Sequence, residues 1–174
     1  MNITVVLTTL NEEEHIEAFL ESLFGQTREP DQVVLVDGHS DDATVDKARE
    51  YDVDIYFDDG DLASARNLGI DRAEGDVVFT DVDGYVEDDW LEEIEQGFET
   101  YPDAVGIQGR SLNTASETLN KNAEQREEGR EVRFTHGANM AFRKEVLKTV
   151  GGFDSNNSCG WEDMDLGYRV SQHG

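Results

Sequence analysis

Short apolar runs alternate with helical patterns along the first 110 residues, and this alternation constrains the fold more than any other feature of the sequence. The apolar runs are rich in β-branched residues and read as buried strands at 3–8, 32–37, 53–57, 76–81 and 104–109. Helical segments separate them. Such an order is typical of a sheet whose strands run parallel and whose faces are covered by helices. The sequence therefore predicts an α/β fold with a mostly parallel sheet.

Apolar spacing and end signals predict the helices. In the first one, Ile16, Phe19, Leu20 and Leu23 recur on one helix face, and Asn11 is expected to be the N-cap. Further helices are expected at about 42–50, 62–73, 88–98, 144–149 and from about 161. Between them, a polar stretch at 111–131 is expected to be a surface excursion, followed by a strand-like stretch at 132–142. A chain of 174 residues is long enough for one domain and short for two.

The chain is strongly acidic, and its charge limits the partners it can have. Fourteen Lys and Arg stand against 40 Asp and Glu, which gives a net charge of −26. Such a field repels nucleic acids and anionic membranes, so an anionic nucleotide would need a metal ion or local cations to bind. The apolar strands exclude a disordered chain. We therefore expect a folded protein adapted to the salt-rich cytoplasm of a halophilic organism, where ions screen its self-repulsion.

Cysteine content and hydropathy indicate the compartment. Cys159 is the only cysteine, so an internal disulfide and a zinc cluster are both excluded. No run approaches the roughly 18 apolar residues of a membrane span, and the first residues do not have the pattern of a signal peptide. We expect a cytoplasmic protein. It would work at the cytoplasmic face of the membrane only through a missing segment or a partner.

Polar residues follow the ends of three predicted strands, at the sheet edge where open parallel sheets bind ligands. Thr9 and Asn11 follow the first strand, Asp37 the second, and Asp81 and Asp83 the fourth. At one strand end, turn formation explains such residues as well as a site does. Three ends together favour a site. The Asp-x-Asp pair is its sharpest element, because carboxylates two residues apart at a strand end point the same way and can share Mg²⁺ or Mn²⁺.

Several common enzyme motifs are absent from the sequence. There is no Gly-x-Gly-x-x-Gly after the first strand, and no Gly-x-x-x-x-Gly-Lys followed by Ser or Thr. Dinucleotide dehydrogenases and P-loop NTPases are therefore excluded. A Gly-x-Ser-x-Gly elbow and a His-Glu-x-x-His helix are also missing, which argues against α/β-hydrolases and zinc proteases of those types.

Taken in order, five segments resemble the family 2 inverting glycosyltransferases with the GT-A fold. They are VVLTTLNEE (5–13), LVDGHSDDAT (35–44), ARNLG (65–69), FTDVDG (79–84), and HGANMAFRKEVLKTVGGFD (136–154) with GWED (160–163). The resemblance implies a Rossmann-like sheet within one catalytic domain. Residues 1–109 would form its nucleotide-binding half and 110–174 an acceptor-side segment, which we expect to be truncated at its C-terminus.

On the donor side, the resemblance implies that Thr9 and Asp37 contact the nucleotide base. It places Arg66 against the base or the diphosphate, Asp81 at the ribose side and Asp83 on the divalent cation, Mg²⁺ or Mn²⁺. The donor would be a UDP- or GDP-sugar. For Arg66, the alternative of an ordinary surface cation stays open.

On the acceptor side, the resemblance makes Asp163 the general base, with Glu162 and Trp161 shaping the pocket. The acceptor would be a glycan or a lipid-linked molecule. The alternative for Trp161 is a core aromatic residue. Gly84 stands where many members have a further acidic residue, so water, the donor or a distant residue such as His136 would complete the metal shell.

Two other functions stay open. VVFTDVDG also resembles the nucleophile loop of haloacid dehalogenase-type phosphatases, with Asp81 attacking phosphate, although that loop usually lies near the start of its chain. The second alternative is a non-catalytic nucleotide-sugar-binding module. Formation of an aspartyl-phosphate would identify the first, and binding of a nucleotide without transfer would identify the second.

Overall fold

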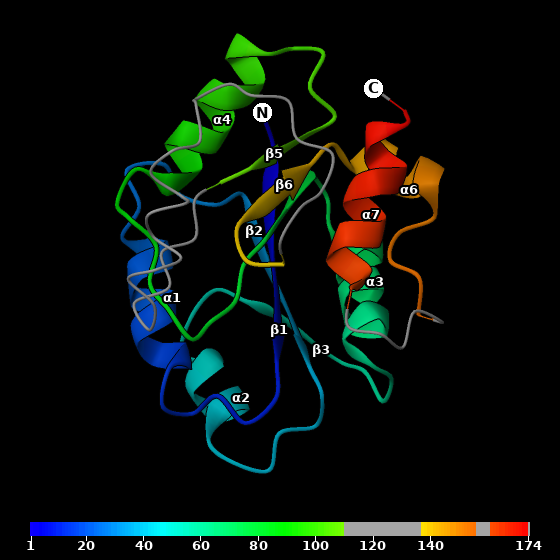
Figure 1. The fold of residues 1–174 in the computed structure, drawn as a ribbon. Coiled ribbons are helices and arrows are strands. Elements are labelled where there is room, and N and C mark those ends of the chain that lie inside the picture. The colour runs from blue at the N-terminus through cyan, green and yellow to red at the C-terminus, as the bar shows by residue number, and fades with distance from the viewer. Residues whose placement is uncertain (110–136, 156–160, 174) are drawn as a thin grey trace, which may run out of the picture.

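The fold is built around one six-stranded sheet, described here from a computed structural model for residues 1–109, 137–155 and 161–173 (Figure 1). The strand order is β3-β2-β1-β4-β6-β5. The strands are β1 (Ile3–Thr9), β2 (Gln32–Asp37), β3 (Asp54–Phe57), β4 (Asp76–Phe79), β5 (Gly106–Gln108) and β6 (Met140–Phe142). The first four run parallel, and β6 is antiparallel to both β4 and β5. The predicted mostly parallel α/β sheet is confirmed.

Helices cover both faces of the sheet, so that the molecule has three layers (Figure 1). Helices α1 (Ile16–Phe24) and α4 (Trp90–Thr100) supply the apolar cluster on one face, with α2 (Thr44–Ala48) beside α1. On the other face lie α3 (Leu62–Arg72), α6 (Lys144–Val150) and α7 (Glu162–Ser171). A sheet covered on both faces needs strands that are apolar throughout, and β1 and β2 are of this kind.

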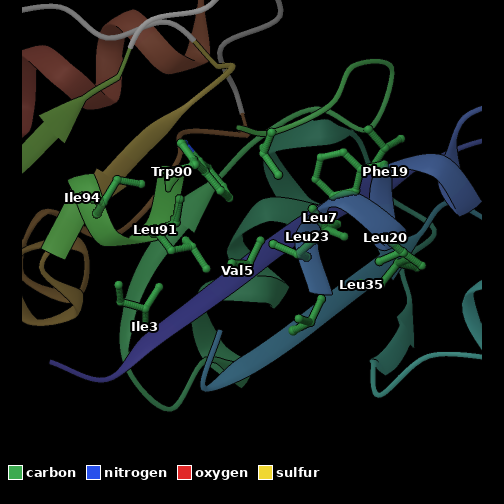
Figure 2. Packing of buried hydrophobic residues seen from close by; sticks show 14 of the residues in the cluster. Ile3, Val5, Leu7, Phe19, Leu20, Leu23, Leu35, Trp90, Leu91 and Ile94 are labelled. Atoms are coloured by element: carbon green, nitrogen blue, oxygen red, sulfur yellow. The ribbon is translucent and has the colours of Figure 1, made fainter. Parts of the chain in front are cut away.

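Strand β1 shows how alternate side chains serve the two layers. Ile3, Val5 and Leu7 point into the cluster with α1 and α4, which Figure 2 shows from close by. Val6 points to the opposite face, into the cluster with α3 and α7. These side chains are at most 1% exposed, so β1 is the centre of both cores.

The structure corrects two details of the first helix and the fourth strand. Asn11 is not an N-cap, because α1 begins at Ile16 and its N-cap position is His15. Asn11 has the left-handed φ of 57°, which turns the chain after β1, and its side chain accepts a hydrogen bond from the Asp41 amide. Strand β4 ends at Phe79, so Asp81 lies in the following loop and not in the strand itself.

The region after β5 is described only in part. The predicted surface excursion at 111–131 and the beginning of the predicted strand at 132–142 lie outside the described residues. Of the described remainder, residues 137–139 are not in a strand and only Met140–Phe142 form one, β6, which lies between β4 and β5. The division into a nucleotide-binding half and an acceptor-side segment stays a prediction.

Candidate functional site

The predicted donor residues Thr9 and Asp37 face each other at the ends of adjacent strands. They are partners in the register of β1 and β2, and the Thr9 hydroxyl donates a 2.9 Å hydrogen bond to Asp37 Oδ2. Thr9 is 5% exposed and Asp37 is fully buried. The two side chains therefore form a fixed polar pair beneath the sheet edge. Contact of this pair with a nucleotide base stays a prediction.

Asp37 also shapes the turn that follows β2. Its carboxylate accepts hydrogen bonds from the Ser40 amide at 2.7 Å and from the Ser40 hydroxyl at 2.6 Å. His39, which precedes Ser40, has a left-handed φ of 62°. Its ring stacks on that of Phe57, with ring centres 5.4 Å apart. Several hydrogen-bond donors therefore satisfy the Asp37 carboxylate although it is buried. Asp37 thus holds the loop that would border a nucleotide.

The Asp-x-Asp pair lies in the loop after β4, as the sequence predicts. Val82 is buried in the core with α1 and α4, whereas the Asp81 side chain is about half exposed, at 51%, and Asp83 is exposed. The core contact of Val82 anchors the loop. The two flanking carboxylates are left at the surface, where solvent or a ligand can reach them.

Crowding raises the pKa of Asp81 above its usual value. Partial burial is the largest cause, and the carboxylates of Asp83, Asp163 and Glu12 add to it. The Arg66 guanidinium acts in the opposite direction and lowers the pKa of Asp81. Carboxylates from the loops after β1 and β4 and from α7 therefore lie close enough to act on one another at this edge of the sheet.

Arg66 is the cation at the centre of this cluster. Its side chain on α3 is 5% exposed, and Nη1 lies 3.0 Å from Glu162 Oε1 while Nη2 lies 3.9 Å from Asp81 Oδ1. The guanidinium also lies 5.3 Å from the centre of the Phe153 ring. The surface-cation alternative is wrong, because Arg66 is buried and joins the Asp-x-Asp loop to α7. Its contact with the donor stays a prediction.

Asp163 and Glu162 occupy the first turn of α7 and point in different directions. Glu162 reaches Arg66, whereas Asp163 Oδ2 accepts a 2.7 Å hydrogen bond from the Gly137 amide. Gly137 itself lies against Arg66, since a Cβ at this position would come within 2.8 Å of Nη2. Adjacent helical residues are about 100° apart, which is why the two carboxylates have different partners.

Trp161 stands at the N-cap position of α7 and is 59% exposed. The core-aromatic alternative is therefore wrong. An exposed indole beside the carboxylates at the start of α7 fits the predicted lining of an acceptor pocket, a role that stays a prediction.

The carboxylates of the Asp-x-Asp loop fit a Mg²⁺ or Mn²⁺ ion whose remaining coordination positions are filled by substrate phosphates and water. Within the described ranges, no three His, Cys, Asp or Glu side chains converge as a metal cage. Mg²⁺ is usually held by one or two carboxylates together with substrate phosphates and water. Asp83, with Asp81 beside it, offers this kind of set, and His136 lies outside the described residues.

Sequence reasoning missed two residues of this region, Asn67 and Phe153. The Asn67 side-chain amide donates a 2.8 Å hydrogen bond to the Phe153 carbonyl and accepts one of 2.8 Å from the Phe153 backbone amide. Glu12 was also missed as a source of negative potential on Asp81. Asn67 belongs to the ARNLG segment and Phe153 to the GGFD turn, and both segments are among those that carry the family resemblance. The contact between the two residues could not be predicted from one sequence.

The sheet order, the two helical layers and the acidic carboxyl edge agree with the predicted GT-A fold. Residues 4–151 match the family described as Glycosyl transferase family 2. The chain belongs to this family. The match does not favour the alternative of a haloacid dehalogenase-type phosphatase.

Relatives and solved structures agree with this family. The glucosyl-dolichyl phosphate glucuronosyltransferase of Haloferax volcanii is 32% identical over 179 residues, which covers 90% of this chain and 57% of the relative. The mannosyltransferase PcManGT of Pyrobaculum calidifontis, solved in complex with GDP-Man and Mn²⁺, is 24% identical with a TM-score of 0.81 and covers 99% of this chain. The S. aureus TarS fragment 1-349 in complex with UDP-GlcNAc is 21% identical with a TM-score of 0.72 and covers 98%.

The chain spans 57% of the Haloferax relative, and 52% and 53% of the two solved chains. The solved structures, at this identity, support the GT-A fold itself. None of the helices in the described part of the chain is both long and apolar enough to cross a membrane.

Proposed function

We propose that the protein transfers a sugar from a nucleotide-diphosphate sugar to an acceptor hydroxyl, with inversion at the anomeric carbon. The observation that carries this proposal is the arrangement around Arg66, which joins Asp81 after β4 to Glu162 at the start of α7. The strand-end carboxylates belong to the donor side, and the first turn of α7 belongs to the acceptor side. Membership of Glycosyl transferase family 2 supports the same reaction.

Asp163 is the proposed general base. As the acceptor oxygen forms its bond to the anomeric carbon, the bond from that carbon to the diphosphate oxygen breaks, and the electron pair leaves with the diphosphate. Asp163 takes the hydroxyl proton. The Gly137 amide fixes the direction of the carboxylate, and a fixed direction is what a general base requires.

On the donor side, Asp83 and Asp81 would hold the divalent cation. When bound, Mg²⁺ or Mn²⁺ supplies positive charge that stabilises the departing diphosphate. Asp37 and Thr9 would border the nucleotide, because they lie under the loop that follows β2. A carboxylate-held cation also agrees with the net charge of −26, since the protein itself repels an anionic donor.

For the donor and acceptor, the names of the similar proteins suggest the candidates to test. PcManGT was solved with GDP-Man and TarS with UDP-GlcNAc, which supports a UDP- or GDP-sugar donor. The Haloferax relative is named for a glucosyl-dolichyl phosphate acceptor, which supports a lipid-linked acceptor. It also supports a halophilic source for this chain.

The test is a transfer screen in molar KCl with Mn²⁺. UDP- and GDP-sugars are combined with dolichyl phosphate-linked saccharides or free glycans, and release of the nucleoside diphosphate is followed together with the product. Transfer to one acceptor supports the proposal. Nucleotide binding without transfer to any of these acceptors supports the binding-module alternative, and formation of an aspartyl-phosphate supports the phosphatase.

Asp163→Asn then tests the base with the pair that the screen identifies. Asparagine keeps the size and most hydrogen bonds of the side chain but cannot take the proton. Turnover should fall by about 10² to 10⁴, while nucleotide binding stays near that of the wild type. If Asp163→Asn is as active as the wild type, Asp163 is not the base. If Glu162→Gln alone is inactive, the two roles are exchanged.

A further inference from the structure

Asn67 holds the backbone of Phe153 as another peptide would. Its Nδ2 donates a 2.8 Å hydrogen bond to the Phe153 carbonyl, and its Oδ1 accepts one of 2.8 Å from the Phe153 amide. The two residues are 86 positions apart in the sequence. A side chain that satisfies both backbone polar groups of one distant residue fixes the position and the orientation of that residue's backbone together.

Gly152, before Phe153, is shaped to this contact. It has φ +69°, in the left-handed region, and a Cβ there would lie 2.3 Å from Asn67 Oδ1. Glycine therefore satisfies two demands at this position, the backbone conformation and the close approach of the asparagine. The close contact therefore depends on two segments of the chain, the one that carries Asn67 and the one that carries Gly152 and Phe153.

The Phe153 side chain extends the attachment to the strand that precedes the Asp-x-Asp loop. It is 3% exposed and packs edge-on against Phe79, the last residue of β4, with ring centres 5.3 Å apart. The guanidinium of Arg66 lies over the Phe153 ring, 5.3 Å from its centre. Phe153 thus contacts α3, which carries Arg66 and Asn67, and the last residue of β4, which precedes the Asp-x-Asp loop.

Helix α3 is itself fixed to the centre of the sheet. Gly69 lies so close to β1 that a Cβ would come within 2.3 Å of Val6 Cγ1. This close packing against β1 therefore fixes the helix turn that carries Arg66 and Asn67. From this turn, Asn67 reaches Phe153 and Arg66 reaches Glu162, so two neighbouring side chains contact the chain before α7 and its first turn.

We infer that Asn67 is a positioning residue for the transfer reaction, which holds the start of α7, and with it Asp163, in register with the donor side. This inference rests on the proposed role of Asp163 as the base. Asn67 touches neither donor nor acceptor; it acts by fixing the backbone of Phe153. Displacement of a reacting group by about 1 Å costs on the order of 10² in rate, so loss of this attachment affects turnover more than binding.

The experiment compares Asn67→Ala and Asn67→Asp with the wild type. Aspartate keeps the acceptor for the Phe153 amide but places an oxygen against the Phe153 carbonyl. Asp71→Asn is the matched control, because Asp71 is an exposed residue on the same helix. Three quantities are measured in molar KCl: amide hydrogen exchange of residues 162–171 and 3–9, affinity for UDP or GDP with Mn²⁺, and kcat with the donor and acceptor from the screen.

In both Asn67 variants we expect exchange in α7 to become at least about fivefold faster while β1 is unchanged. Nucleotide affinity should stay within about twofold, and kcat should fall by roughly tenfold or more. Asp71→Asn should change none of these. If Asn67→Ala does not fold, Asn67→Asp carries the same expectations.

Two outcomes would overturn the inference. If exchange in α7 and kcat both stay at wild-type values, Asn67 holds nothing that the reaction uses. If nucleotide affinity falls as much as kcat, Asn67 serves the donor site or the whole fold. An active Asp163→Asn would instead contradict the proposed base, and it would leave the exchange result for Asn67 in place.

Discussion

The Arg66–Glu162 pair is a largely buried ion pair, and the effect of its removal on the free energy of unfolding follows from its surroundings. Arg66 is 5% and Glu162 15% exposed, and their atoms are 3.0 Å apart. Breaking a buried pair by removing one partner typically costs about 3–5 kcal/mol, because the other charge stays buried without compensation. Since solvent reaches Glu162 in part, we expect Arg66→Met to lower the free energy of unfolding by about 3 kcal/mol.

A double-mutant cycle separates the pair from the other contacts of Arg66. Glu162→Gln keeps the shape of the side chain and should cost about 1–2 kcal/mol, because glutamine can still accept a hydrogen bond from the guanidinium. The double variant should be less destabilised than the sum of the two single variants, with a coupling energy of about 1–2 kcal/mol. The measurement is urea unfolding followed by circular dichroism in molar KCl.

The exposed pair Arg49–Asp46 provides the matched control. Its side chains are 61% and 80% exposed and lie 2.8 Å apart, so geometry is similar while burial differs. The corresponding cycle with Arg49→Met and Asp46→Asn should give a coupling energy of about 0–0.5 kcal/mol. Equal coupling energies for the two pairs would refute the argument that burial gives the Arg66 contact its strength.

Four further experiments examine the site and the charge. Asp83→Ala should abolish Mn²⁺-dependent binding of UDP or GDP in calorimetry, and undiminished wild-type affinity in EDTA would disprove the metal assignment. Asp37→Ala should weaken nucleotide binding by releasing the Ser40 turn, and a weakened acceptor instead would reverse the map of the site. Because the pKa of the Asp81 carboxyl is raised in the folded protein, the folded state binds the carboxyl proton more tightly than the unfolded state does. The free energy of unfolding should therefore fall as the pH rises from the ordinary pKa of an aspartate through the raised pKa of Asp81. Asp81→Asn should therefore raise the unfolding midpoint at pH 7, with the gain disappearing in acid; a gain independent of pH would exclude this cause. Circular dichroism at low and at molar KCl should show loss of the fold at low salt, and unchanged folding would disprove adaptation to salt.

The parallel part of the sheet could be predicted because its strands are buried on both faces. Strands of this kind read as continuous apolar runs, as 32–37 does, and the helices between them carry a clear apolar face. The antiparallel place of β6 could not be predicted. Its pairing with β4 and β5 joins residues far apart in the sequence, and the three residues of β6 have no pattern that sets their direction.

For the site, the sequence predicts which residues lie at the carboxyl edge of the sheet, but it does not predict which side chains they contact. The Asp-x-Asp loop follows β4 as expected, because Val82 is apolar and turns inward while its neighbours turn outward. Arg66 shows the failure. Nothing in a helical ARNLG segment tells whether its arginine is exposed or buried, since that depends on Glu162 and Phe153, which arrive from the other end of the chain.

The pairing of Arg66 with carboxylates adds to the repulsion that the net charge of −26 exerts on an anionic donor. An anionic donor needs positive charge at this acidic edge, and Arg66 is held 3.0 Å from Glu162 and 3.9 Å from Asp81. A guanidinium shared between two carboxylates has less charge to offer a diphosphate than a free one has. Around it, Asp83, Asp163 and Glu12 act on Asp81 in the same unfavourable sense, so a diphosphate at this edge would meet a negative potential. The proposed divalent cation would remove this obstacle and relieve the raised pKa of Asp81 in the same step, because a bound cation favours the ionised carboxylate. Binding of donor and cation should therefore be mutually dependent, each strengthening the other by the same factor.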